Sequence, residues 1–288
     1  MENSTQNKIQ LIVTVSAIIL LALTYIPKKS SDINPSSLEK TNFSAFSDEI
    51  ILPISWGDLG KKMIEAGVID RDKFESLYTA RGGFDEETKK LLTEGNNNDL
   101  KMTSQNSGTI LNLLWAFGLS NQNEILERGP MSDPKYGSPA GFASTGGWTL
   151  AKGDVMGHYS KHLFVVLTPE QQVLVEKVSK NIYRPCCNNS TYFPDCNHGM
   201  AMLGLLELLA SQEISEDEMY KIALDVNSLW FPSQYEAIAR FMGAKGIKWQ
   251  DVNPKEILGI NFSSASGYAK VESSLPREQN QGGGSCGV

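Results

Sequence analysis

Two long apolar segments constrain the fold of this 288-residue chain more than any other feature. Residues 104–120 read SQNSGTILNLLWAFGLS, and residues 198–212 read HGMAMLGLLELLASQ. Both segments are longer than a typical buried strand and are apolar around most of a helical circumference, which predicts two buried helices. We therefore expect a mainly α fold in which the second segment lies at the centre of the core.

Further helices are marked by capping residues. Thr168 and Gln171 form the pattern of a capping box, with proline at the first helical position between them. Ser215 and Glu218 repeat the box before another helix. We find no run of alternating strands, and the apolar stretch LFVV is too short and isolated to build a sheet. The sequence therefore predicts a compact multi-helix domain over residues 49–262.

The N-terminal part of the chain is expected to cross a membrane. No residue from 9 to 27 is charged, and this stretch has the length needed to span a hydrocarbon core of about 30 Å. An anchor followed by a polar, Ser-rich tether is the usual plan of an exported bacterial domain. We therefore expect a single-pass cell-membrane protein with an extracytoplasmic domain. The predicted parts are an anchor or uncleaved signal at 1–27, a flexible tether at 28–48, the helical domain at 49–262 and a flexible Gly-rich tail at 263–288.

The charge of the chain excludes one class of partner. The formal net charge is −7 at pH 7, and we find no basic stripe, so no nucleic-acid partner is expected. The sequence has no H-E-x-x-H pattern of a metalloprotease, and no catalytic residue is assigned. The predicted partners are a membrane, through residues 9–27, and a metal ion.

The candidate site is a cluster of soft metal ligands. All three histidines and three of the four cysteines fall between residues 158 and 198. Thiolate and imidazole together suit zinc or copper rather than the hard cations Ca²⁺ and Mg²⁺, which prefer oxygen. The predicted ligands are Cys186, Cys187, Cys196, His198, His158 and His162.

Local spacing suggests how these ligands are presented. His158 and His162 stand four residues apart, which on a helix places both imidazoles on one face. We expect that helix to approach the loop that carries the cysteines. Asp195 is expected to cap the following apolar helix, which places Cys196 at a helix N-terminus, where the macrodipole favours a thiolate.

Three functions stay open from the sequence. The preferred one is binding of copper or zinc for sensing, sequestration or delivery of the ion. In the second, Cys196 exchanges disulfides with Cys186 or Cys187, and Cys286 on its Gly-rich tail is a mobile exchange partner. In the third, a disulfide between Cys196 and one of the two adjacent cysteines only staples the loop, stabilising the domain by about 2–3 kcal/mol.

The segment RPCCNNSTYFPDCNHG resembles a family signature. It is similar to the motif of a group of bacterial, mostly membrane-tethered proteins named for a Pro-Cys-Tyr-Cys-Gly-Cys run. Here two cysteines are adjacent where that group alternates three, and the histidine follows the Asp-Cys pair. The resemblance implies a membrane-attached, extracytoplasmic, Cys-rich domain, and it implies no enzyme activity. The matching positions are Pro185, Cys186, Cys187, Asp195, Cys196 and His198.

Overall fold

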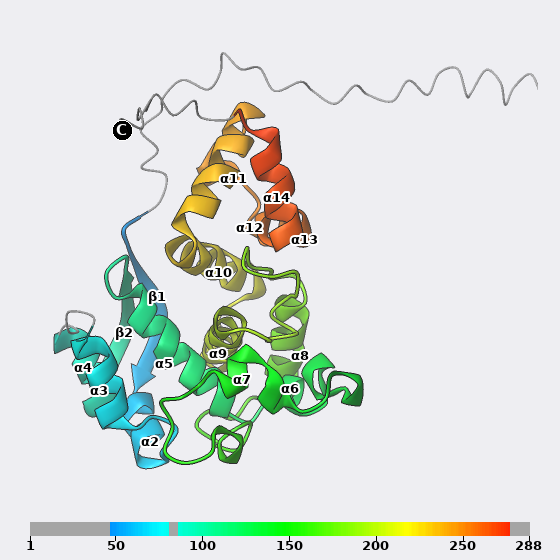
Figure 1. Cartoon of the computed structure of the whole chain (residues 1–288). Coiled ribbons are helices and arrows are strands. Elements are labelled where there is room, and N and C mark those ends of the chain that lie inside the picture. Colours follow the sequence, from blue (N-terminus) through cyan, green and yellow to red (C-terminus); the bar gives the residue numbers. More distant parts are fainter. Residues whose placement is uncertain (1–46, 81–85, 277–288) are drawn as a thin grey trace, which may run out of the picture. The chain divides into compact units, whose positions relative to one another are not determined.

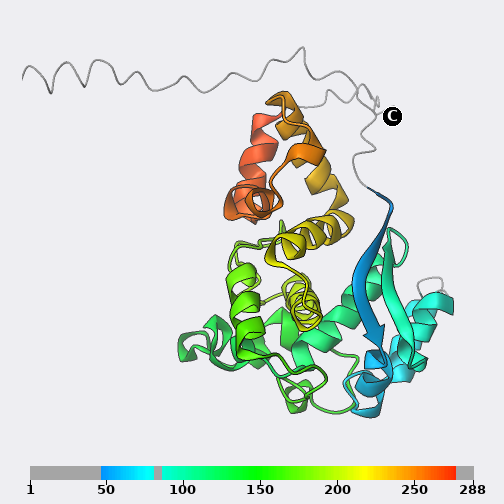
Figure 2. The ribbon, with the colours of Figure 1, turned by 180° about the vertical axis from the view of Figure 1, so that it is seen from behind.

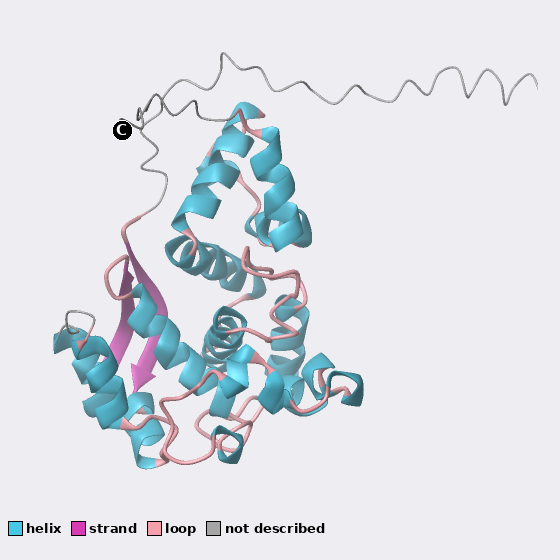
Figure 3. Cartoon of the chain, in the orientation of Figure 1, coloured by secondary structure: helices cyan, strands magenta, loops and turns pink. Residues whose placement is uncertain are grey.

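Helices make up most of the structure, a computed structural model in which residues 47–80 and 86–276 are described (Figure 1, Figure 3). The mainly α fold predicted from the sequence is confirmed for these residues. The strands are β1 (Glu49–Gly57) and β2 (Asn97–Thr103). The helices are α2 (Leu59–Glu65), α3 (Arg71–Thr79), α4 (Glu86–Thr93), α5 (Ser107–Ser120), α6 (Glu124–Arg128), α7 (Ala143–Gly146), α8 (Pro169–Ser179), α9 (Asn197–Ser211), α10 (Glu216–Trp230), α11 (Pro232–Ala244), α12 (Pro254–Ile257), α13 (Ile260–Ser263) and α14 (Ala265–Ser274). Short 3₁₀ turns interrupt the loops at η2 (Pro130–Ser132), η3 (Pro134–Tyr136), η4 (Pro139–Gly141), η5 (Val155–Gly157) and η6 (Trp249–Asp251).

The two apolar segments form α5 and α9, which pack against each other in the core (Figure 1, Figure 2). Their backbones approach closely at two glycines. A Cβ added at Gly204 would lie 2.6 Å from the Leu114 carbonyl oxygen, and one added at Gly118 would lie 2.3 Å from the Met200 carbonyl oxygen. Helix α9 also contacts α7, α8 and α10, so it is central, as predicted.

Gly204→Ala and Gly118→Ala are each expected to lower the free energy of unfolding by about 1–3 kcal/mol, because the added methyl group overlaps a main-chain carbonyl that cannot rotate away. Urea unfolding followed by circular dichroism measures the effect. Gly108→Ala, also on α5, is the matched control, because a Cβ there meets no atom within 4 Å. Equal midpoints for all three variants would show that the two helices do not meet through these glycines.

The predicted start of α8 is confirmed in detail. The Thr168 hydroxyl accepts a hydrogen bond from the Gln171 amide at 3.2 Å, and the Gln171 side chain accepts one from the Thr168 amide at 2.9 Å. Helix α10 begins in a similar way, because the Ser215 hydroxyl accepts a bond from the Glu218 amide at 3.4 Å.

The structure contains a two-stranded antiparallel sheet that the sequence analysis missed. Strand β1 pairs with β2, with an irregularity between Leu52 and Ser55. Its buried side chains alternate at Leu52, Ile54 and Trp56, a period-two pattern that was present in the sequence but short. The Trp56 indole nitrogen donates to the Leu91 carbonyl at 2.8 Å, which fixes the strand against α4.

The predicted tail boundary at residue 262 is wrong. Residues 265–274 form helix α14, which packs against α11 and α13. The Ser264 hydroxyl caps it by accepting a bond from the Gly267 amide at 2.9 Å. Val271 is buried, and a Cβ at Gly267 would lie 2.2 Å from the Ile260 carbonyl oxygen, so this helix is held closely. The sequence did not predict this helix because the segment is mostly polar and only Gly267 and Val271 are buried.

The predicted anchor, residues 1–27, and almost all of the predicted tether at 28–48 lie outside the described residues. Among the helices of residues 47–80 and 86–276, none has both the length and the apolar character needed to cross a bilayer. The membrane anchor therefore stays a prediction.

Candidate metal centre

Of the six predicted ligands, the three cysteines lie on the loop that joins α8 to α9, and His198 lies on the first turn of α9. The loop is held by helix α14. The Cys187 carbonyl accepts a hydrogen bond from the Ala265 amide, and the Asn188 side-chain oxygen accepts one from the Ser266 amide, both at 2.9 Å. The segment predicted as a flexible tail therefore fixes the position of the cysteine loop.

Two groups of potential metal ligands occur in this loop. The first comprises Cys186, Cys196 and His198, and the second comprises Cys187, Asp195 and Cys196. Within each group, all donor atoms lie within 4.8 Å of one another. The sulfurs of Cys186 and Cys196 are 3.7 Å apart, and the three cysteines of the loop are free thiols. Cys196 is the ligand that both groups share.

A buried arginine holds the loop together. Arg184 is 1% exposed, and its Nη2 donates to Asp195 Oδ1 at 2.6 Å. Its other nitrogens donate to the Asn189 carbonyl at 3.0 Å and, through Nε, to Cys196 Sγ at 2.9 Å. A further bond from Nη2 reaches the Phe193 carbonyl at 3.2 Å. The guanidinium therefore bonds to the middle and the C-terminal end of the loop and lies against one candidate ligand.

The first turn of α9 leaves room for this guanidinium. A Cβ at Gly199 would lie 2.5 Å from Arg184 Cζ, so only glycine fits beneath the side chain. Gly199 follows His198 directly, and the pair was part of the predicted motif. Gly199 is therefore part of helix α9 and also leaves the space that the Arg184 guanidinium occupies beside the site.

Asp195 does not cap α9, contrary to the sequence prediction. The N-cap position is Cys196, which makes no side-chain capping bond. Both Asp195 oxygens are used elsewhere. Oδ1 accepts a hydrogen bond from Arg184 Nη2 at 2.6 Å, and Oδ2 accepts one from Asn189 Nδ2 at 2.7 Å. Both carboxylate oxygens are therefore engaged within the loop and not by the amides of the first turn of α9.

The surroundings of Cys186 and Cys196 shift the pKa values of these two thiols in opposite directions. Hydrogen bonds from Cys186 and Cys187, a hydrogen bond with His198 and the charge of Arg184 lower the pKa of the Cys196 thiol, although burial opposes them. Hydrogen bonds with Cys187 and Cys196, together with burial, raise the pKa of Cys186. The thiolate therefore forms first on Cys196, the ligand that both groups share.

The imidazole of His198 is packed against aromatic rings. Its ring centre lies 4.5 Å from that of Phe231 and 5.7 Å from that of Trp230. These contacts restrict the rotation of the ring. His198 is partly exposed and belongs to the first ligand group, as predicted.

His158 and His162 do not join the cysteines, and this part of the sequence prediction is wrong. Neither belongs to a ligand group in the described residues. They lie in the turn after η5 and not on a helix, since Ser160 between them has a φ of 50°. Their rings face each other, with His158 Nδ1 3.1 Å from His162 Nε2. A separation of four residues between His158 and His162 is typical of one face of a helix, but a turn can bring two such residues together as well.

The histidine pair has a defined hydrogen-bond arrangement. His158 Nε2 lies 3.1 Å from the Lys152 carbonyl oxygen, which can only accept, so this nitrogen carries a proton. In the neutral form of His158 that carries this proton, Nδ1 is the acceptor and Nε2–H of His162 is the donor. Burial and the neighbouring His158 lower the pKa of His162. The two imidazoles therefore contact each other within the fold and lie outside both ligand groups.

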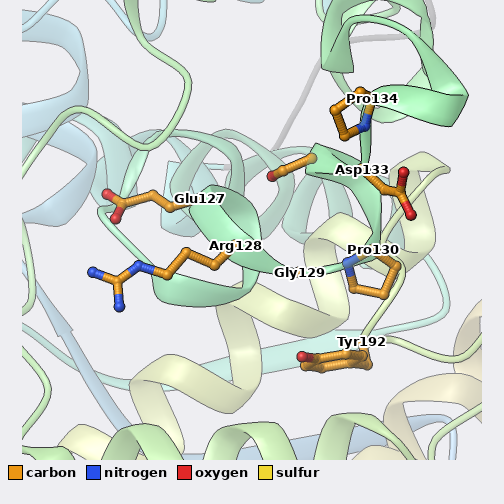
Figure 4. Close-up of a pocket in the computed structure, with 8 residues that line it drawn as sticks. Glu127, Arg128, Gly129, Pro130, Asp133, Pro134 and Tyr192 are labelled. Atoms are coloured by element: carbon orange, nitrogen blue, oxygen red, sulfur yellow. The ribbon is translucent and has the colours of Figure 1, made fainter.

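Two further observations delimit the site. Cys286, predicted as a mobile thiol, lies outside the described residues. A surface hollow of about 500 Å³ lies beside α6 (Figure 4), and its lining contains no cysteine or histidine. The candidate ligands therefore do not open into this hollow. Its lining residues are Glu127, Arg128, Gly129, Pro130, Ser132, Asp133, Pro134 and Tyr192.

Two important residues escaped the sequence analysis. The first is Arg184. It and Asp195 are the only residues with formal charge from position 184 to 197, so the sequence already indicated that they could form an ion pair across the loop. Glu207 is the only acidic residue in the apolar segment 198–212, and it is fully buried in α9. A charge isolated in an apolar or cysteine-rich stretch needs a partner, and this was the available evidence.

The chain was compared with protein-family models, with curated proteins and with solved structures, and none of the three comparisons gave a match. The resemblance to the Pro-Cys-Tyr-Cys-Gly-Cys group therefore stays a prediction.

Proposed function

We propose that this protein binds one soft transition-metal ion, zinc or copper, through Cys186, Cys196 and His198. The distance between the two sulfurs carries the proposal. Two sulfurs bound at about 2.3 Å to a tetrahedral Zn²⁺ lie about 3.8 Å apart. Cys186 Sγ and Cys196 Sγ are 3.7 Å apart, so an ion needs little rearrangement of these two side chains.

The first ligand group is favoured over the second because its atoms are available. Using Asp195 as a ligand would compete with its bonds to Arg184 and Asn189, at 2.6 and 2.7 Å. Cys186 is exposed, and His198 is partly exposed on the first turn of α9. A fourth position is left for water or for a donor of a partner, which suits an ion that is delivered or exchanged.

Two thiolates and one imidazole fit the preferences of Zn²⁺ and Cu(I). The lowered pKa of Cys196 supports binding near neutral pH, because the thiolate is the ligand form. The proposal includes the sequence prediction that residues 9–27 anchor the protein in a membrane, with the metal centre used for sensing, sequestration or delivery.

Cys196→Ser is expected to weaken Zn²⁺ binding by more than about 100-fold, because it removes a ligand itself. Removing only a hydrogen-bond partner of a ligand typically weakens binding by about 10–100-fold. Cys186→Ser and His198→Ala are expected to weaken it as well. The full chain, purified in detergent under reducing conditions, is titrated with Zn²⁺ against a chromophoric chelator. Co²⁺ provides a second readout, because thiolate ligands give it charge-transfer absorption.

His158→Ala is the matched control for His198→Ala, because it removes a histidine that lies outside both ligand groups. It is expected to bind Zn²⁺ as the unmodified chain does. Absence of stoichiometric binding by the unmodified chain, or equal weakening by both histidine variants, would contradict the proposed ligand set.

A further inference from the structure

The three thiols of the loop are not equivalent partners for one another. Cys186 is exposed, and its sulfur is 3.7 Å from that of Cys196. The Cys187 sulfur instead lies 3.8 Å from the Asn189 carbonyl oxygen and 3.9 Å from Asp195 Oδ1. Cys187 Sγ also lies within 4.8 Å of Cys196 Sγ. Cys186 is the exposed thiol of the two and its sulfur is 3.7 Å from that of Cys196, so the geometry favours Cys186 as the thiol that pairs with Cys196.

We propose that Cys186 and Cys196 close into a disulfide by exchange with a small external disulfide, and that closure releases the metal ion. The inference rests on the proposed function, because it describes how the same ligands are switched off. It adds a redox activity with a defined pair of residues.

The exchange occurs in two balanced steps. Cys186, which is a thiolate while it holds the ion, attacks one sulfur of the small disulfide, forms a mixed disulfide and expels one small thiolate. The thiolate of Cys196 then attacks Cys186 Sγ, forms the internal bond and expels the second small thiolate. Two protein thiolates are oxidised by two electrons, and the external disulfide is reduced to two small thiolates, which take up protons from the solvent.

Closure requires a short movement. A disulfide bond is about 2.05 Å long, and the two sulfurs start 3.7 Å apart. Cys186 can supply most of this movement because its side chain is exposed. Cys196 is held at the start of α9 by its contact of 2.9 Å with Arg184 Nε, so it provides the fixed end.

Closure removes both ligand groups at once, because they share Cys196. The first group loses two of its three ligands, and the second loses one. Among the described residues, Cys187, Asp195 and His198 form no further group with donors within 4.8 Å of one another. The oxidised loop therefore has no triad left for the ion.

The test treats the full Zn²⁺-loaded chain with oxidised glutathione as the small disulfide. Released Zn²⁺ is measured with a chromophoric chelator, and the new bond is mapped by peptide mass spectrometry without reduction. We expect a Cys186–Cys196 linkage to appear together with release of about one Zn²⁺ per linkage, and a dithiol reductant to reverse both.

Two variants make the result specific. Cys187→Ser keeps the reacting pair and the first ligand group, so it is still expected to bind Zn²⁺, to form the Cys186–Cys196 bond and to release the ion. Cys186→Ser is expected to form no internal bond within the loop. Unimpaired closure through Cys187 and Cys196 in Cys186→Ser, or Zn²⁺ release without any internal bond, would overturn the inference.

The failures of the two proposals are distinguishable. A chain that binds Zn²⁺ but forms no Cys186–Cys196 bond overturns the redox inference and leaves the metal-binding proposal standing. A chain that forms the bond but never binds Zn²⁺ overturns the metal-binding proposal and, with it, the release step.

Discussion

Arg184→Met is expected to lower the free energy of unfolding by about 3–5 kcal/mol, the range found when one partner of a buried ion pair is removed. The guanidinium is 1% exposed and forms the ion pair with Asp195 at 2.6 Å. It also satisfies the carbonyl oxygens of Asn189 and Phe193, at 3.0 and 3.2 Å. Methionine replaces the apolar stem of the side chain but supplies none of these donors, so the loop loses the hydrogen bonds of the guanidinium.

The unfolding free energies of the reduced, metal-free variant and unmodified chain are compared by urea titration. Arg128→Met is the matched control, because the Arg128 side chain is 74% exposed and its distance to Glu124 is 3.9 Å. That variant is expected to differ from the unmodified chain by less than about 1 kcal/mol. Similar losses in the two variants would show that the cysteine loop does not depend on its buried arginine.

Glu207→Gln is expected to remove a large pH dependence of stability. Burial raises the pKa of Glu207 well above its ordinary value, although the side-chain amides of Asn121 and Asn123 oppose the shift. Its Oε2 accepts from Asn121 at 2.6 Å, and its Oε1 has no hydrogen-bond partner among the described residues. An ionised carboxylate in this position is poorly compensated, so the folded state holds the neutral acid.

The sign of the pH effect follows from the raised pKa. Below the pKa of the unfolded state, Glu207 is protonated in both states and costs no ionisation energy. Above it, the unfolded chain releases the proton and the folded chain keeps it. Stability therefore falls by about 1.4 kcal/mol for each pH unit until the folded pKa is reached.

Urea unfolding between pH 4 and pH 8 measures this slope. We expect Glu207→Gln to lose the slope and to exceed the unmodified chain in stability at neutral pH. The amide oxygen can still accept from Asn121, and the ionisable proton is gone. Glu236→Gln, at an exposed position of α11, is the matched control and is expected to retain the slope. A slope unchanged by Glu207→Gln would assign the pH dependence to another group.

The sequence predicted those parts of the fold that depend on local patterns. The apolar segments around Leu114 and Gly204 were long enough to be assigned as helices, and Thr168 with Gln171 marked a helix start through contacts between neighbours in the chain. Strand β1 was missed because its alternation spans only a few residues. Helix α14 was missed because its buried face is narrow in an otherwise polar segment.

The candidate site was predicted in composition but not in arrangement. Cys186, Cys196 and His198 lie close together because one short loop carries them, and closeness in sequence was sufficient evidence. The separation of His158 from that loop depends on how distant elements pack, and no local pattern reports such packing. The pairing of Arg184 with Asp195 likewise depends on the closed shape of the loop.

The double use of the Asp195 carboxylate has a consequence for discrimination among cations. An oxygen-seeking ion such as Mg²⁺ would have to take Asp195 from Arg184, which would leave a buried guanidinium without its counter-charge. Binding of such an ion would destabilise the folded loop, and this loss would oppose binding even where the bonds between the ion and oxygen are strong. A sulfur-seeking ion at Cys186 and Cys196 leaves that ion pair intact and incurs no such cost.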